Sequence, residues 1–294
     1  MHRETKACLK ISFVNILWGL SFIASKTALA NGFSPFWLAF VRFAIATALL
    51  LPLLKQRKGR LRLEKGSFWR MLCSGLLGIT LYFAFEHNGL ARTSASTASL
   101  IIAAIPAFTL LYGVLFKRQR PPLLSYLGVG ASLLGVFLIV FFGSNEGQDT
   151  LAGSLLLICA CLCWVGYMQV TETLTGQYTS LEITFWQSLL GAAALLPCAL
   201  GLEERMDWSA TTPLGWAMVL YLAILCSVVA YLLYVDAVRE LKPLRTAIFI
   251  NLNPLAGVLG GVLLLGERLS PVQLLGGLIV LVSIFLVNRR AGRG

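Results

Sequence analysis

The chain has 294 residues, of which 57% are hydrophobic and only 13% are charged, about half the charged share of an ordinary soluble domain. This composition excludes a water-soluble fold, because there are too few charges to cover a polar surface. The net charge of +11 does not indicate nucleic-acid binding, because the basic residues lie in short segments between long apolar runs.

The apolar runs are about 20 residues long, the length that an α-helix needs to cross the hydrocarbon of a bilayer. They lack the period-2 alternation of a membrane β-barrel. The first run resembles a secretory signal peptide, but its length and the nine later runs favour an uncleaved helix. The chain therefore predicts an all-α integral membrane protein with ten transmembrane helices. The predicted helices span residues 11–30, 35–54, 67–88, 95–116, 123–142, 151–171, 180–201, 213–237, 245–265 and 271–288.

Basic residues concentrate in alternate connecting segments, most densely in KQRKGRLRLEKG at residues 55–66. Cytoplasmic segments of membrane proteins carry such an excess of Lys and Arg. We therefore expect a multi-pass protein of the cytoplasmic (inner) membrane with both termini in the cytoplasm. A second interpretation of residues 55–66 is a patch that binds anionic lipid, and both can hold together.

The polar segment SNEGQDT at residues 144–150 divides the chain into two groups of five predicted helices. Similar residues recur in the same order in both groups, which indicates an internal duplication with repeats at residues 1–143 and 151–294. An odd number of helices per repeat inverts the topology of the second copy. Inverted repeats are common in transporters whose substrate site lies near the bilayer midplane. The matched pairs include Trp18 with Trp164, Trp69 with Trp216, Pro106 with Pro254 and Gly128 with Gly276.

Four motifs are spread over both halves. They are LWGLSFIASK at 17–26, LAFVRFAIA at 38–46, GLARTSASTASLIIAAIPAF at 89–108 and VRELKPLRTAIFINLNPLAGVLGGVLLLGERLS at 238–270. In this pattern the chain resembles the ten-helix, EamA-like members of the drug/metabolite transporter (DMT) superfamily. The resemblance implies a bacterial carrier that exports amino acids or similar small metabolites. One departure is Arg118-Gln119 in place of a second Gly-Glu, so Glu267 is expected to order a loop.

Matched prolines interrupt the fourth and ninth predicted helices. Pro106 and Pro254 each lack an N–H and clash with the carbonyl four residues back, and in hydrocarbon such carbonyls need partners or must line a cavity. Matched helix breaks in two repeats are the best sequence pointer to a transporter site. The alternative is a packing kink whose polar groups bond to the neighbouring backbone.

Aromatic and small polar residues near the middle of several predicted helices are the expected lining of such a cavity. Trp18 with Ser21 and Trp164 with Tyr167 are equivalent pairs three residues apart, so each pair shares a helix face. Aromatic walls with a few polar groups suit a small organic metabolite. Packing or interfacial anchoring is the alternative for any one aromatic residue. The candidate substrate-binding residues are Trp18, Ser21, Tyr82, Ser99, Trp164, Tyr167, Tyr231, Asn251 and Asn253.

Three charged residues within the predicted helices, Arg42, Lys26 and Glu86, are candidates for coupling or gating. Arg42 lies about 12 Å into its helix, where a charge costs at least about 2.5–3.5 kcal/mol and must face protein or water. It acts either as a structural tie or as a ligand contact. Glu86 is either a partly hydrated interfacial residue beside His87 or a vestibule residue that exchanges a proton as substrate leaves. Lys26 can snorkel to the interface or pair with Glu86.

The motifs of an enzyme or of an ATP-driven pump do not occur in the sequence. HExxH, GxSxG and GxxxxGK[ST] are absent, so neither an intramembrane enzyme nor direct ATP hydrolysis is expected. A channel would favour rings formed by oligomeric symmetry. We expect a monomeric secondary transporter that works by alternating access, without cofactor or metal, with a small-molecule substrate and the lipid bilayer as partners. Proton coupling is a hypothesis, and export of drugs or cationic metabolites or sugar-phosphate exchange are the alternatives.

Overall fold

The structure is a computed structural model that describes residues 2–59, 61–142, 149–202, 206–249 and 252–291, and every regular element in these ranges is helical. The first half contains α1 (His2–Ala30), α2 (Pro35–Gln56), α3 (Lys65–Gly75), η1 (Leu76–Leu81), α4 (Tyr82–Leu90), α5 (Ala95–Ile102), α6 (Ile105–Leu115) and α7 (Leu123–Phe142). The second half contains α8 (Leu151–Leu174), α9 (Ser180–Gly201), η2 (Trp208–Ala210), α10 (Pro213–Tyr221), η3 (Leu222–Val229), α11 (Ala230–Ile248), α12 (Leu252–Leu265) and α13 (Pro271–Ala291).

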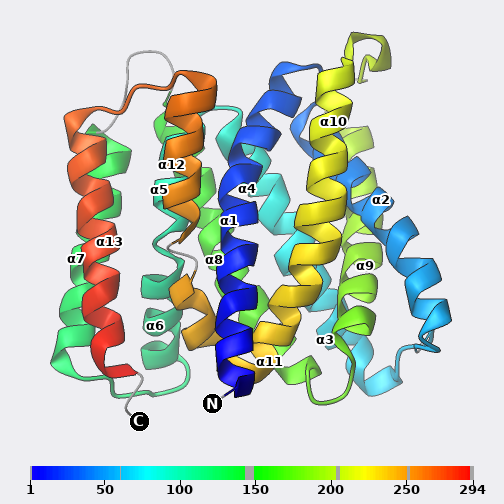
Figure 1. The fold of residues 1–294 in the computed structure, drawn as a ribbon, viewed down its shortest axis with the longest axis horizontal. Helices are drawn as coiled ribbons and strands as arrows, with labels where there is room; N and C mark the ends of the chain where they lie inside the picture. Colours follow the sequence, from blue (N-terminus) through cyan, green and yellow to red (C-terminus); the bar gives the residue numbers. More distant parts are fainter. Residues whose placement is uncertain (1, 60, 143–148, 203–205, 250–251, 292–294) are drawn as a thin grey trace.

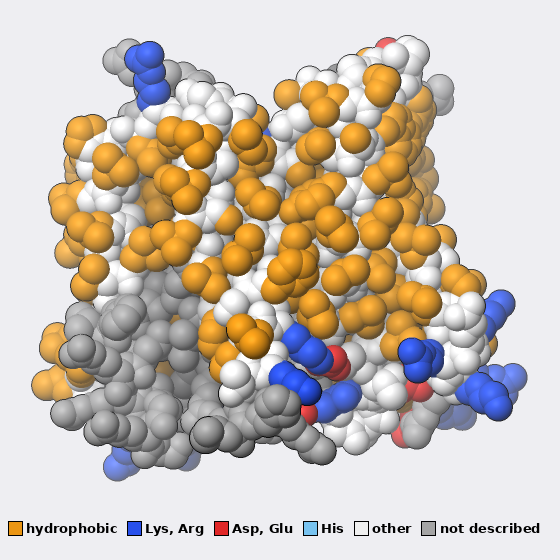
Figure 2. All heavy atoms as spheres, viewed as in Figure 1, with side chains coloured by type: hydrophobic (Ala, Val, Ile, Leu, Met, Phe, Trp, Pro, Cys, Tyr) orange, Lys and Arg blue, Asp and Glu red, His pale blue; other side chains and the backbone are white. Residues whose placement is uncertain are grey.

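Several of these elements join end to end into long apolar helices. Among the described residues, eight such helices have the length and composition to cross a membrane, and α12 and residues Pro271–Ser283 of α13 are shorter apolar helices. The protein is therefore an all-helical, multi-pass membrane protein. Hydrophobic side chains cover the middle of the molecule, and Lys and Arg gather near the edge that carries the N-terminus (Figure 1, Figure 2). The eight helices are Thr5–Ala30, Pro35–Gln56, Lys65–Leu90, Ala95–Leu115, Leu123–Phe142, Leu151–Leu174, Ser180–Gly201 and Pro213–Leu241.

The helices of the two halves interleave. The last helices of the halves, α7 and α13, pack side by side at one end of the molecule, and α2 packs against α9 at the other (Figure 1). Between these pairs, α1 packs against α12, and α8 packs against α5 and α6. Each of these contacts has its counterpart when the halves are exchanged, as expected for two duplicated units. The centre of the molecule is therefore built from both halves.

Two π-helical segments occupy matched places in the third and eighth predicted helices. The segment η1 spans Leu76–Leu81 between α3 and α4, and η3 spans Leu222–Val229 between α10 and α11. Such segments disturb the regular α-helical hydrogen bonding and are frequent at functional sites. The sequence analysis did not predict them.

One helix boundary differs from the sequence prediction. The sequence predicts that the eighth helix ends at residue 237 and that the ninth begins at residue 245, whereas α11 continues to Ile248 and α12 begins at Leu252. A hydrogen bond helps to hold the part of α11 that continues beyond residue 237, because Arg239 Nε donates to the Thr175 carbonyl at 3.1 Å. The predicted loop is thus helical, and the ninth helix is shorter than expected.

Candidate functional site

A central cavity lies where α1, α2, α4, α8, α11 and α12 meet the break between α5 and α6. Its volume, measured as the space open to the centres of water-sized molecules, is about 30 Å³. That space suffices for a few waters. The cavity must therefore widen before it can hold a metabolite.

Aromatic side chains from both halves form one wall of the cavity. Trp18 of α1 lies edge-on to Trp164 of α8, with ring centroids 5.2 Å apart, and its ring is 5.6 Å from that of Tyr231 on α11. About one helical turn further along α8 and α11, the buried rings of Tyr167 and Tyr234 stack at 6.1 Å. These two rings form a second aromatic layer beyond the wall of the cavity.

The π-helical segments hold two of these aromatic residues in place. Trp18 Nε1 donates to the carbonyl of Cys226 in η3 at 3.0 Å, and the Tyr231 hydroxyl donates to the carbonyl of Gly78 in η1 at 3.2 Å. Gly78 also lets α8 approach closely, because a Cβ at this position would lie 2.2 Å from the ring of Tyr167. Each half thus anchors an aromatic side chain that belongs to the wall of the cavity.

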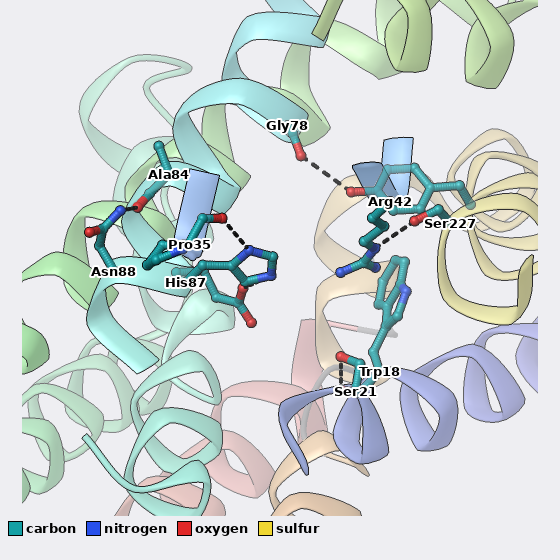
Figure 3. Close-up of polar contacts among 11 residues, drawn as sticks. Trp18, Ser21, Pro35, Arg42, Gly78, Ala84, His87, Asn88 and Ser227 are labelled. Atoms are coloured by element: carbon teal, nitrogen blue, oxygen red, sulfur yellow. Dashed lines mark hydrogen bonds and ion pairs between the residues drawn. The ribbon is translucent and has the colours of Figure 1, made fainter. Parts of the chain in front are cut away.

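Arg42 of α2 is buried, and its guanidinium group lines the cavity. Its Nε donates to the Ser227 hydroxyl of η3 at 2.6 Å, and its guanidinium carbon lies 4.4 Å from the ring centroid of Phe83. The cation–π contact and the hydrogen bond hold the charge while the outer end of the guanidinium group points into the space between Trp18 and His87 (Figure 3). Arg42 is therefore a structural tie and also available to a ligand.

Glu86 and His87 are buried together on α4. Glu86 lines the cavity and is 2% exposed, and His87 is 0% exposed. His87 Nε2 lies 3.1 Å from Glu86 Oε2, and His87 Nδ1 lies 3.1 Å from the carbonyl of Pro35 (Figure 3). The surrounding helices enclose Glu86, so its side chain lies in the cavity and not on the outer surface of the protein, and its role in proton exchange stays a prediction.

Two cavity-lining groups present acceptors that have no hydrogen-bond partner among the described residues. They are Glu86 Oε2 and Asn253 Oδ1. Buried polar atoms are normally hydrogen-bonded, so these atoms are suited to accept from an ammonium or N–H group of a ligand. Among the described residues, no group of three His, Cys, Asp or Glu side chains is placed to hold a metal ion.

Most of the candidate substrate-binding residues line the cavity, namely Trp18, Ser21, Tyr82, Trp164, Tyr231 and Asn253. Tyr167 instead lies behind the wall and directs its hydroxyl to Gln187 Oε1 at 3.4 Å. Ser99 packs against Gly257 of α12 and donates to the Ser96 carbonyl. The rotation of a helix about its axis decides these placements, and spacing alone does not determine that rotation. Asn251 lies outside the described residues.

Pro106, Pro254 and Lys26 do not line the cavity. Residues 103–104 separate α5 from α6 immediately before Pro106, and Ile102 at the end of α5 lines the cavity. Pro254 lies in the first turn of α12 and lines a separate apolar groove. Lys26 Nζ donates to the carbonyls of Leu90 and Thr93 at 2.8 and 2.5 Å, so these hydrogen bonds tie it to the end of α4 and not to Glu86.

The sequence analysis missed four cavity-lining residues, which are Phe22, Phe83, Ile102 and Ile105. Two of them had an available signal. Phe22 lies one helical turn after Trp18 and therefore on the same face, and Ile102 is the residue whose carbonyl Pro106 leaves without its usual donor. Phe83 and Ile105 follow Tyr82 and precede Pro106 directly, and no spacing rule selects them.

Glu267, which was expected to order a loop, connects the two halves at one end of the molecule. Its carboxylate accepts from the backbone N–H groups of Ala95 and Ser96 at 2.7 and 2.9 Å, and from the Ser96 hydroxyl at 2.6 Å. A carboxylate satisfies the free N–H groups at a helix N-terminus and interacts favourably with the helix dipole. Glu267 therefore caps α5 from the α12–α13 connection.

Comparison with known proteins places the chain among transporters. The sequence model of the EamA-like transporter family matches residues 5–141 and 151–289. An uncharacterized transporter of Archaeoglobus fulgidus is 31% identical, covering 98% of this chain and 99% of its own. A probable terminal-alkyne amino-acid exporter of Streptantibioticus cattleyicolor is 25% identical, covering 97% and 94%. One solved crystal structure shares the fold, with a TM-score of 0.72 at 19% identity over 98% of this chain and 99% of that one.

Proposed function

Because the chain belongs to the EamA-like transporter family of the DMT superfamily, we propose that it exports amino acids or similar small metabolites through the central cavity by alternating access. The family and the names of the relatives indicate a membrane transporter of small molecules and not an enzyme. We further propose that it is a monomer of the cytoplasmic membrane, with both termini in the cytoplasm and repeats at residues 1–143 and 151–294.

A basic and an acidic side chain in one cavity are the observation that carries the proposal. Arg42 and Glu86 both line it, and the free acceptor of Asn253 lies in the same wall. An amino acid has a carboxylate for the guanidinium group and an ammonium group for the two acceptors. The aromatic wall with Trp18 and Trp164 suits its side chain.

The closed state of the cavity supports alternating access. The second aromatic layer, with Tyr167 and Tyr234, lies beyond one wall of it, while the edge of the molecule away from the N-terminus is notched between the lobe with α12 and α13 and the lobe with α1 and α10 (Figure 2). Movement of one bundle against the other would open the cavity to one side at a time. In this scheme the aromatic layer acts as the inner barrier.

The two alternative substrate classes fit the cavity less well. An exporter of cations would favour a buried acid without a base nearby, yet Arg42 lines the same cavity as Glu86. A sugar-phosphate exchanger would favour several basic groups, and Arg42 is the one basic residue among the described residues that line this cavity.

The experiment that tests the proposal is counterflow in proteoliposomes. Vesicles loaded with an unlabelled amino acid should accumulate the labelled form transiently and saturably, since a carrier exchanges its substrate. Asn253→Ala should weaken this exchange, and the thermal stabilisation that the ligand gives, because the variant removes an acceptor that has no hydrogen-bond partner among the described residues. Asn88→Ala is the matched control, because Asn88 donates to the Ala84 carbonyl of its own helix. Unsaturable flux, or no exchange with any amino acid, would contradict the proposal.

A further inference from the structure

A backbone carbonyl determines which nitrogen of His87 carries a proton. His87 Nδ1 lies 3.1 Å from the carbonyl oxygen of Pro35 at the start of α2 (Figure 3). A carbonyl oxygen can only accept a hydrogen bond, so Nδ1 must donate. In a neutral imidazole the other nitrogen, Nε2, then has no proton and can only accept.

That second nitrogen faces an acid. His87 Nε2 lies 3.1 Å from Glu86 Oε2, within ion-pair range, but neither atom makes an aligned hydrogen bond to any described residue. The two side chains are 0% and 3% exposed. A carboxylate beside a neutral imidazole would place two lone pairs against each other and leave a buried charge without a donor. One more proton, on either atom, makes the contact favourable.

We infer that Glu86 and His87 together bind one proton and exchange it for the substrate. This inference rests on the proposed export function. In the substrate-free protein the pair holds the proton and has no net charge. The ammonium group of an arriving substrate displaces that proton into the cytoplasmic water, and the Glu86 carboxylate then pairs with the ammonium. After the substrate leaves on the outer side, the pair takes a proton from that side, so one proton enters for each substrate exported.

The groups around the pair are compatible with this exchange. Arg42 of α2 carries the nearby charge in the cavity, and Lys26 of α1 is held by carbonyls at the end of α4. The sequences of η1 and α5, which also pack near α4, contain no titratable side chain. The remaining titratable neighbours are phenols and thiols, which are neutral at physiological pH. They are Tyr82 of α4, Cys161 of α8, Cys226 of η3 and Tyr231 of α11.

One helix connects the proton site to the substrate site. Pro35, which fixes the His87 ring, and Arg42, which lines the cavity, both belong to α2 and lie about two turns apart. Movement of α2 relative to α4 would separate the Pro35 carbonyl from Nδ1 and shift the guanidinium group relative to Glu86 at the same time. A movement of α2 would therefore affect proton binding and substrate binding together.

The test counts protons and substrate in the same sample. Purified wild-type protein in weakly buffered detergent solution receives an amino acid that supports counterflow, and a pH-indicator dye reports proton release. We expect about one proton per substrate bound, and substrate flux in proteoliposomes that follows an imposed pH gradient. Substrate binding without proton release would overturn the inference and leave the transport function standing. Absence of counterflow with every amino acid would overturn both.

Two variants and one control test whether Glu86 and His87 bind the released proton. Glu86→Gln removes the carboxyl group and should abolish proton release per substrate bound. His87→Asn keeps a donor for the Pro35 carbonyl but offers no basic nitrogen to Glu86, so it should lose most of the release. Asn88→Ala changes the next side chain on α4, outside the cavity lining, and should release protons as the wild type does. Full release by Glu86→Gln or His87→Asn would overturn the inference, and the wild-type stoichiometry decides it if either variant fails to fold.

Discussion

The two halves of the molecule share a helical framework but differ in the charge that they bring to the cavity. The first half contributes Arg42 and Glu86, whereas the second contributes Trp164, Tyr231 and Asn253, which are uncharged. Both halves contain a π-helical segment whose carbonyl anchors an aromatic residue. Both halves thus place an aromatic side chain in the same way, while the charged side chains of the cavity come from one half.

Arg42 in the second helix of the first half has Gln187 as its counterpart, 145 residues later in the second half, and this pair shows the divergence most clearly. Arg42 uses its Nε for Ser227 and presents the rest of its guanidinium group to the cavity. Gln187 is fully buried in α9, and its Nε2 donates to the hydroxyls of Ser74 and Thr171, each at 3.0 Å. Corresponding positions therefore line the cavity in one half and form internal hydrogen bonds in the other.

Substitutions at these two positions give the largest expected effect. Arg42→Gln should weaken amino-acid binding by about 2 kcal/mol or more, roughly thirtyfold, because a buried charged partner is lost. Gln187→Leu should instead lower the free energy of unfolding by about 1–3 kcal/mol, since buried hydroxyls lose an acceptor or donor, with little change in ligand affinity. Ligand-dependent thermal melting measures both quantities. Equal losses of affinity in the two variants would remove the proposed difference between the halves.

A substitution in η1 tests whether the π-helical framework needs its close packing. Gly78→Ala should destabilise the protein by about 1–3 kcal/mol, because the new methyl group would overlap the Tyr167 ring. The control is Gly176→Ala, where nothing lies within 4 Å of an added Cβ. Thermal unfolding of the purified proteins gives the comparison. Equal melting temperatures for the two variants would show that α8 does not pack against η1 in this way.

Substitutions that remove hydrogen bonds between Glu267 and α5 should lower the stability of the protein less than the changes above. Glu267→Gln should destabilise the protein by about 1 kcal/mol, because the helix N-terminus of α5 loses its charged acceptor. Ser96→Ala should cost less, since it removes one of the three donors to that carboxylate. Thermal unfolding again measures both. A larger effect for Ser96→Ala than for Glu267→Gln would contradict the assignment of Glu267 as the cap.

The sequence predicted most of the framework and of the cavity. Eight of the ten predicted spans coincide with described helices long enough to cross a membrane, because span length is a direct consequence of bilayer thickness. The matched pair Trp18 and Trp164 was found at the cavity because duplication places equivalent residues about the same centre. Arg42 was expected to face protein or water because a charge is costly in hydrocarbon, and it is buried within the helices.

The features that were not predicted depend on helix rotation or on side-chain conformation. The side chains of Ser99 and Tyr167 do not line the cavity. In a helix that is apolar on all sides, the hydrophobic periodicity does not show which face a residue occupies. The π-helical turns have no distinguishing residue types, and the extension of α11 to Ile248 depends on tertiary bonds of Arg239. The ring of His87 turns back toward Glu86 although successive helical residues point about 100° apart, because the Pro35 carbonyl holds it there.

The most direct test of the charge-paired cavity compares three ligands that share one apolar side chain, namely leucine, isopentylamine and 4-methylpentanoate. Each is offered to the wild-type protein as the exchanging substrate in counterflow. The account predicts rapid exchange of leucine and little or none of the amine or the acid, because each of these lacks a partner for Arg42 or for Glu86. Exchange of the amine as fast as leucine would contradict it.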